Sequence, residues 1–222
     1  MRTTLPAILL ALATLLPAAP ALSGAWPRGA GKHFNSTGLR IDERATPGRP
    51  RLAYTVYHEY GVTDRLTAVA EADHGGRTLG KALAFAQWTL TDPAATWQVS
   101  MAAGGGLQDE DRLLQARLLV GRGLTIRGKG GWVDALAAVL SNLDTGRHAA
   151  KLDLTLGWSP TERAKTYVQV FAYAAEDAPV YLRAEASVAW NLWRDTWLDV
   201  GASTGITPNR DRRYRVGIWT SF

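Results

Sequence analysis

The chain has 222 residues with no cysteine, and its 25 basic and 20 acidic residues give a net charge of +5. This length suits one domain, and the charges form neither an acidic nor a basic tail. The lack of cysteine excludes disulfides and a cysteine-linked lipid anchor, so stability has to come from packing or from a closed hydrogen-bond network.

Residues 1–23 have the pattern of a secretory signal peptide. Arg2 supplies a positive charge, residues 5–16 form an apolar run too short to span a bilayer, and small residues follow in PAAPALSGA. A retained membrane anchor is the alternative, and both the short apolar run and Pro6 argue against it. We therefore expect an exported protein.

Two cleavage sites fit the small residues that end this segment. Cleavage after Ser23 starts the mature chain at Gly24, and cleavage after Ala25 starts it at Trp26. With the first site as the boundary, residues 24–222 are predicted to form a single domain.

Apolar residues in the mature chain recur at every second position. From Leu152 to Trp158 the even-numbered residues are apolar, and residues 182–192 and 198–206 repeat the pattern. A period of two is typical of β-strands with one apolar and one polar face. No further apolar run approaches the length of about 18 residues that a membrane-spanning helix needs.

Strands of this kind follow one another along the whole mature chain, separated by short turn sequences. We predict twelve, at about residues 31–43, 51–61, 66–74, 79–91, 96–106, 112–121, 128–141, 147–158, 164–175, 180–193, 196–206 and 212–222. Each is long enough to cross hydrocarbon as a tilted strand, and the number is even. The fold class predicted is all-β: a closed, antiparallel, up-and-down transmembrane β-barrel with both termini in the periplasm.

The weakest part of this map is the segment WVDALAAVLSNL at residues 132–143. Val133, Leu136, Ala137 and Leu140 also fit the spacing of a helix. A helix here would remove a strand, and the length of the segment favours the strand.

The aromatic residues separate by strand end. Tryptophans gather near the predicted periplasmic ends and tyrosines near the outer ends, as in the two aromatic girdles of membrane barrels. The girdle residues are Trp88, Trp97, Trp132, Trp158, Trp190, Trp193, Tyr54, Tyr173, Tyr181 and Tyr214. Trp197 and Trp219 fall on the inner face, which a bulge or a ring inside the lumen would explain. A soluble sandwich or barrel would also alternate, but its strands would be shorter.

The last strand runs from Tyr214 through Val216, Ile218 and Thr220 to Phe222, with these residues on one face. It resembles the C-terminal signature of Gram-negative outer-membrane β-barrel proteins, in which a terminal Phe follows apolar residues at every second position. The resemblance implies an outer-membrane location and an assembly signal, at Tyr214, Val216, Ile218 and Phe222, that the barrel assembly machinery reads. Thr220 departs from the pattern, because an aromatic residue is more usual there.

The predicted mature start, GAWPRGAGKHF at residues 24–34, is similar to the start of a poorly characterised group of small proteobacterial outer-membrane barrels. The segment YHEYGVTDRLT at residues 57–67 is similar to the first periplasmic hairpin of such barrels, although many barrels share it. These two resemblances indicate a class of protein and name no substrate.

The polar faces of the strands predict a wet lumen lined by equal numbers of acids and bases. The lumen residues are Glu59, Glu71, Asp73, Lys81, Arg117, Lys151, Asp153, Arg183, Glu185, Asp199, Arg213 and Arg215. Twelve strands enclose more space than small side chains fill, so these charges either line a narrow channel or pair across it. Because an unpaired buried charge is costly, we expect most of them to pair.

A passive pore or uptake channel for small polar solutes is the leading functional hypothesis, with a non-conducting structural or surface-binding barrel as the alternative. A lipid-modifying enzyme, the third reading, needs a Ser–His pair on the outer wall, and no histidine of the chain has a serine at the expected spacing. We therefore expect no catalytic residues, no metal and no cofactor. The expected partners are outer-membrane lipids, lipopolysaccharide and the assembly machinery, and nucleic acid is not among them.

Overall fold

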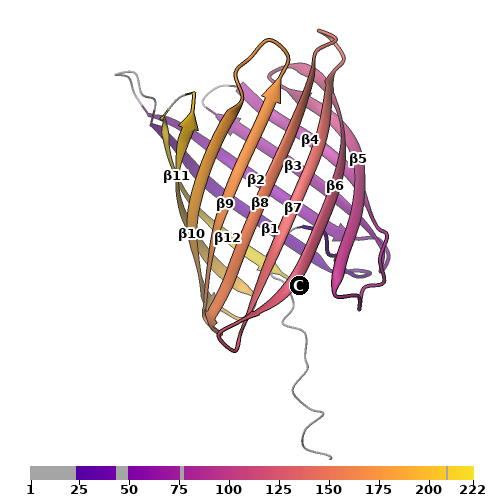
Figure 1. The fold of residues 1–222 in the computed structure, drawn as a ribbon, viewed down its shortest axis with the longest axis vertical. Helices are drawn as coiled ribbons and strands as arrows, with labels where there is room; N and C mark the ends of the chain where they lie inside the picture. Colours follow the sequence, from indigo (N-terminus) through magenta and orange to yellow (C-terminus); the bar gives the residue numbers. More distant parts are fainter. Residues whose placement is uncertain (1–23, 44–49, 76–77, 209) are drawn as a thin grey trace, which may run out of the picture.

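The structure is a computed structural model that describes residues 24–43, 50–75, 78–208 and 210–222. Twelve antiparallel strands form one closed barrel (Figure 1), in which each strand pairs with its neighbours in sequence and the first pairs with the last. The strands are β1 (His33–Glu43), β2 (Arg51–Gly61), β3 (Leu66–Gly75), β4 (Thr78–Thr89), β5 (Trp97–Gln108), β6 (Asp111–Ile126), β7 (Lys129–Asn142), β8 (His148–Thr161), β9 (Ala164–Ala175), β10 (Tyr181–Trp193), β11 (Thr196–Thr207) and β12 (Arg212–Ser221).

The predicted fold class is confirmed, and the predicted strand bounds agree with the observed ones to within a few residues, except at the end of β6. That strand continues to Ile126, because a tight turn at Arg127 and Gly128, both with positive φ, lets it pair with β7 over its full length. The segment with helical spacing is strand β7, which pairs with β6 on one side and β8 on the other. Within the described residues no helix has the length and apolar character needed to cross a membrane. The predicted signal peptide lies outside the described residues.

The barrel closes through the two ends of the chain. β1 and β12 pair from Phe34 opposite Ser221 to Glu43 opposite Arg212. The ladder includes the final residue, because His33 and Phe222 exchange backbone hydrogen bonds of 2.7 and 3.1 Å. Every strand therefore has two neighbours, and no sheet edge is left in the wall.

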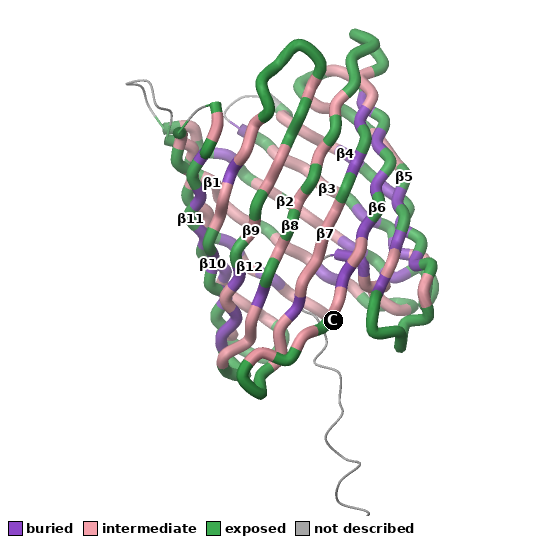
Figure 2. Tube along the Cα trace, viewed as in Figure 1, coloured by how far each residue is buried: buried purple, intermediate pink, exposed green. Residues whose placement is uncertain are grey.

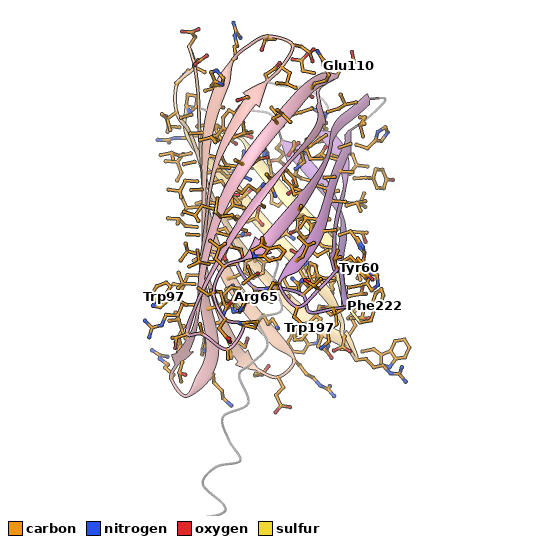
Figure 3. The ribbon with its side chains drawn as sticks, turned by 90° about the vertical axis from the view of Figure 1, so that its right-hand side faces the viewer. Tyr60, Arg65, Trp97, Glu110, Trp197 and Phe222 are labelled. Carbon is orange, nitrogen blue, oxygen red and sulfur yellow. The ribbon has the colours of Figure 1, made fainter. Side chains whose placement is uncertain are left out.

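The two ends of the barrel carry different side chains. Trp97, Tyr60, Trp197 and Phe222 lie toward one end, here called the terminal end, and Glu110 lies at the opposite end, here called the far end (Figure 3). Along the strands buried and exposed residues alternate (Figure 2), most regularly in β6. Since opposed residues on paired strands share a face, the register assigns each residue to the lumen or to the outside.

The lumen is not uniformly polar. An apolar cluster fills its β3–β7 side and consists of Ala25, Val69, Leu83, Phe85, Ala102, Leu113, Leu119, Ala138 and Leu140. The expectation that the apolar side of every strand faces outward is therefore wrong for this half, where strands such as β7 are apolar on both faces. The interior is divided into a packed half and a charged half.

Candidate functional site

The structure places all twelve predicted lumen residues on the inner face, and each has a partner of opposite charge. Arg40 contacts Asp73 at 2.7 Å, and Arg117 and Lys81 contact the two oxygens of Glu71 at 2.7 and 2.8 Å. The remaining pairs are Arg28–Glu59, Lys151–Asp153, Arg183–Asp211, Arg213–Asp42, Arg215–Glu185 and Arg215–Asp199. Pairing offsets the cost of removing these charges from bulk water.

A cavity of about 710 Å³ occupies the charged half of the lumen, between β7–β12 and β1–β2. Its walls carry both charges and aromatic rings. They include Arg40, Lys151, Asp153, Arg183, Glu185, Arg213, Arg215, Phe171, Tyr173 and Tyr181. Lys151 and Arg213 remain 34% exposed despite their partners, so these cations are available to a solute in the cavity. The arrangement suits small polar molecules, since charges of both signs line the space.

Toward the terminal end, the cavity meets a cluster of aromatic rings formed by Phe34, Trp132, Tyr167 and Trp219. The ring centroid of Tyr167 lies 5.8 Å from that of Trp219 and 6.4 Å from that of Trp132. The hydroxyl of Tyr167 donates to Asp199 at 2.7 Å and accepts from Arg215 at 2.8 Å. These four rings, here called the aromatic floor, are linked to the charged wall of the cavity through the hydroxyl of Tyr167.

The aromatic floor contains one tryptophan that was predicted in the lipid-facing girdle, and it explains the two tryptophans that were predicted on the inner face. Trp132 was expected on the lipid face, but it is 4% exposed and packs inside the barrel, because it shares the inner face of β7 with Asp134. Trp197 and Trp219 are indeed inner residues: Trp219 belongs to the floor and Trp197 packs against it.

The other predicted tryptophans lie on the outer face toward the terminal end. They are Trp88, Trp97, Trp158, Trp190 and Trp193, and all but the half-buried Trp158 are about half exposed or more. Tyr60 lies at the same level, where the ring of His33 stacks on that of Phe222 and lies tilted against that of Tyr60. Tyr60 was missed, although it has the same parity as the predicted Tyr54.

Toward the far end, Tyr54 and Tyr214 are exposed on the outer face as predicted. Tyr173 and Tyr181 are not girdle residues. They oppose each other on the inner face and line the cavity, where the Tyr181 hydroxyl accepts a hydrogen bond of 2.6 Å from Arg183. Their parity puts them on the face of Lys151, which opposes Tyr173 across the ladder.

Residues 24–31 enter the lumen before β1 begins, which the sequence pattern did not indicate. Gln87 donates to the carbonyl of Gly24 at 2.9 Å, and Ser100 donates to the carbonyl of Ala25 at 2.6 Å. The amide of Ala25 donates to Asp134 at 3.2 Å. These contacts hold the segment against the inner wall of the packed half.

Further contacts continue along this N-terminal segment. Arg28 pairs with Glu59 and stacks over Phe34, with its guanidinium carbon 4.5 Å from the ring centroid. Gly121 leaves room for the indole of Trp26, because a Cβ there would lie 2.6 Å from the ring. At Gly61 a Cβ would lie 1.7 Å from the carbonyl oxygen of Gly29, so a side chain is excluded where the segment crosses β2. Residues 24–31 and the aromatic floor together narrow the terminal end.

One Ser–His contact lies on the outer wall near the far end. The Ser141 hydroxyl and Nδ1 of His148 are 3.0 Å apart. Glu176 accepts a hydrogen bond from the backbone amide of His148, so it does not orient the ring as the third member of a triad would. In the part of the chain that the structure describes, no three His, Asp or Glu side chains converge as metal ligands.

Comparison with models of protein families and with curated protein sequences gives no match. Solved structures do match. The KdgM porin, in complex with disordered oligogalacturonate, has a TM-score of 0.61 and 8% identity, over 84% of this chain and 99% of that chain. An outer membrane channel from Pseudomonas putida has a TM-score of 0.61 and 10% identity, over 87% and 96% of the two chains.

A third similar structure is the translocator domain of the autotransporter NalP from Neisseria meningitidis. Its TM-score is 0.51 at 13% identity, over 87% of this chain and 89% of that chain. At such identities the likeness shows the fold alone. This chain has the closed β-barrel fold of outer-membrane proteins that include porins and channels.

Proposed function

We propose that this protein is an outer-membrane channel that passes small polar solutes passively through the charged half of its lumen. The observation that carries this proposal is the cavity of about 710 Å³, lined by Arg40, Lys151, Asp153, Glu185 and Arg213, that reaches the aromatic floor. In this proposal both chain termini, and with them the terminal end, face the periplasm, and the far end faces outside. The exposed apolar residues between the two ends lie in lipid. Both charge signs are present, so selectivity between anions and cations is weak.

The wall and the last strand define the partners in this proposal. Lipid and lipopolysaccharide cover the outward residues such as Leu152, Leu154 and Val216, all more than 40% exposed. Tyr214, Val216 and Ile218 share the outer face of β12, Phe222 directly follows this strand, and the assembly machinery reads these four residues before the barrel closes. Nucleic acid has no part in this function.

The test is single-channel recording in planar bilayers with purified mature protein. Discrete openings are expected, and Trp219→Ala in the floor is expected to raise the conductance, because it removes a ring at the narrow end. Trp193→Ala, on the outer face, is the matched control and should leave the conductance unchanged. If neither the wild type nor Trp219→Ala shows channel openings, the channel proposal is wrong.

A non-conducting barrel is the second candidate, and a specific observation favours it. Residues 24–31 and the floor residues Phe34, Trp132, Tyr167 and Trp219 pack inside the barrel toward the terminal end. In that case the ion pairs stabilise a sealed wall, and the far-end turns carry the function. Silent bilayers together with normal folding are the result expected for this candidate.

A further inference from the structure

Like Lys165, which lies over the ring of Trp197, Asp134 is a charged residue inside the barrel that the ion-pair network leaves out. Its half-buried carboxylate faces the lumen from β7, and in the described residues no basic side chain lies within ion-pair distance of it. Its hydrogen-bond donor is the amide of Ala25, at 3.2 Å. Asp153, a diagonal neighbour on the inner face of β8, carries the same charge, because Asp134 opposes Thr155 in the ladder. A carboxylate in this position is costly unless a cation reaches it.

Gly24 lies against that carboxylate. A Cβ on Gly24 would be 2.6 Å from Oδ2 of Asp134 and 3.3 Å from Oδ1, so a side chain at this position would require the carboxylate to move. The nitrogen of Gly24 is bonded to the same Cα, at about 1.46 Å. A cation on this nitrogen therefore reaches Asp134 with little movement of the backbone.

The hydrogen bonds of residues 24 and 25 distinguish the two cleavage sites that the sequence leaves open. Gln87 and Ser100 are buried, and they donate to the carbonyl oxygens of Gly24 and Ala25. A mature chain that begins at Trp26 lacks both acceptors. Ser100 would keep its contact with Thr89 at 2.9 Å, but the buried Gln87 amide would lose its acceptor, which is destabilising. The contacts are complete only when Gly24 is present.

We propose that the bond between Ser23 and Gly24 is the processing site, and that the ammonium group released on Gly24 pairs with Asp134 to fix residues 24–31 inside the lumen. A signal peptidase hydrolyses the peptide bond with one water molecule, which leaves a carboxylate on Ser23 and an amine on Gly24. An α-amino group has a pKa of about 8, so this amine is protonated at neutral pH. Processing thus converts a neutral amide into the counter-ion that Asp134 otherwise lacks.

The pairing has a consequence for the lumen. Before cleavage the carboxylate has only the Ala25 amide, and after cleavage a charge-assisted contact holds the first residue of the segment. In this proposal the segment is therefore held by one more contact in the processed protein than in the precursor. This inference concerns the N-terminal segment and does not require that the barrel conduct.

The first experiment is an intact-mass measurement on protein purified from the outer membrane after export of the full chain. The expected mass is that of residues 24–222. The mass of a chain that begins at residue 26, or the mass of the unprocessed chain, would overturn the proposal.

The second experiment measures whether the ammonium and Asp134 act on each other. The chain has no cysteine, so an Ala25→Cys variant provides a single thiol whose reaction with a maleimide reports the segment leaving the lumen. Four forms of this variant are refolded and compared. The first begins at Gly24, the second has one extra alanine before Gly24, the third carries Asp134→Asn, and the fourth combines the extra alanine with Asp134→Asn. The extra alanine and Asp134→Asn are each expected to raise the labelling rate about tenfold. The two changes together are expected to raise it no further, because both remove the same interaction.

Glu185→Gln is the matched control, because it removes a lumen carboxylate that pairs with Arg215 and has no contact with the segment. Its labelling rate is expected to equal that of the parent. Independent, multiplied effects of the extra alanine and Asp134→Asn, or no effect of either, overturn the pairing. Mass and labelling are read without any current, so failure of the channel proposal and failure of this one are separate results.

Discussion

The guanidinium of Arg117 lies over the ring of Phe85, with its carbon 3.5 Å from the ring centroid, and donates to Oε1 of Glu71 at 2.7 Å. This contact joins β6, β4 and β3 inside the lumen. It places a charge at the edge of the apolar cluster, where Lys81 is a second cation beside Glu71. The packed half of the lumen therefore depends on one arginine that is stacked and paired at once.

Arg117→Ala should destabilise the barrel. It removes the stacking on Phe85 and one of the two cations at Glu71, which costs about 2 to 3 kcal/mol for a buried, charged hydrogen bond. Urea unfolding of the refolded protein in detergent, followed by tryptophan fluorescence, measures the loss. Arg112→Ala removes an exposed ion pair with Asp144 and should lower the midpoint far less than Arg117→Ala does. Equal midpoints for Arg117→Ala and the wild type would contradict the role of Arg117.

Tyr167→Phe tests the link between the floor and the charged wall. The phenol is a hydrogen-bond partner of both Asp199, which is 0% exposed, and Arg215. Removing the hydroxyl takes one hydrogen-bond partner from the buried Asp199 and one from the partly exposed Arg215, and we expect a loss of about 1 to 3 kcal/mol in the free energy of unfolding. Tyr54→Phe, on the exposed outer face, should change it by less than about 0.5 kcal/mol. A similar loss for the two variants would mean that the phenol contacts are unimportant.

Lys151 and Asp153 form a pair in the cavity wall and give opposite predictions for ion preference. Lys151→Gln leaves an unneutralised carboxylate and should shift the preference toward cations, whereas Asp153→Asn should shift it toward anions. Arg183 is less suitable for such a test, because it is 3% exposed and bonded to Ser203 and Tyr181. The reversal potential in a KCl gradient measures the shift. Shifts of the same sign in both variants would argue against a conducting path past this pair.

The turn between β7 and β8 has a defined pH dependence. Hydrogen bonds from the Arg112 side chain, at 2.9 and 2.7 Å, lower the pKa of Asp144 below its ordinary value. A carboxyl whose pKa is lower in the folded state stabilises the fold above its unfolded pKa, and that contribution is lost as the pH falls through the folded pKa. In Arg112→Ala, Asp144 should therefore titrate at a higher pH than in the wild type. An NMR titration of the side-chain carboxyl carbon checks this, and identical curves would refute it.

Ser141 and His148 are within hydrogen-bond distance on the outer wall, but we expect no lipid hydrolysis. The imidazole has no carboxylate on its other nitrogen among the described contacts, and such a partner normally holds the histidine as a base. Fatty-acid release from phospholipid vesicles should equal that of a protein-free blank, and Ser141→Ala should not change it. Release that disappears in Ser141→Ala would establish an enzyme.

The sequence alone determined the number of strands, their order and, for most of them, which residues share a face. It did so because the side-chain period of a strand is two and each strand is long enough to show it. The register of the charged residues follows from the same alternation, so all twelve lumen residues were placed on the face where the structure has them. The closing role of the last strand was equally readable, since Tyr214, Val216 and Phe222 repeat at even positions.

Only the tertiary structure decided what fills the lumen. The alternation predicts that Trp132 shares a face with Asp134 and that Tyr173 shares a face with Phe171. It does not show which face of a strand meets lipid when both faces are partly apolar. Residues 24–31 have no period at all, because they are held by contacts with distant strands, such as Gln87 to Gly24 and Ser100 to Ala25. Such contacts depend on which strands the closed barrel brings together, and that information is not local to any one segment.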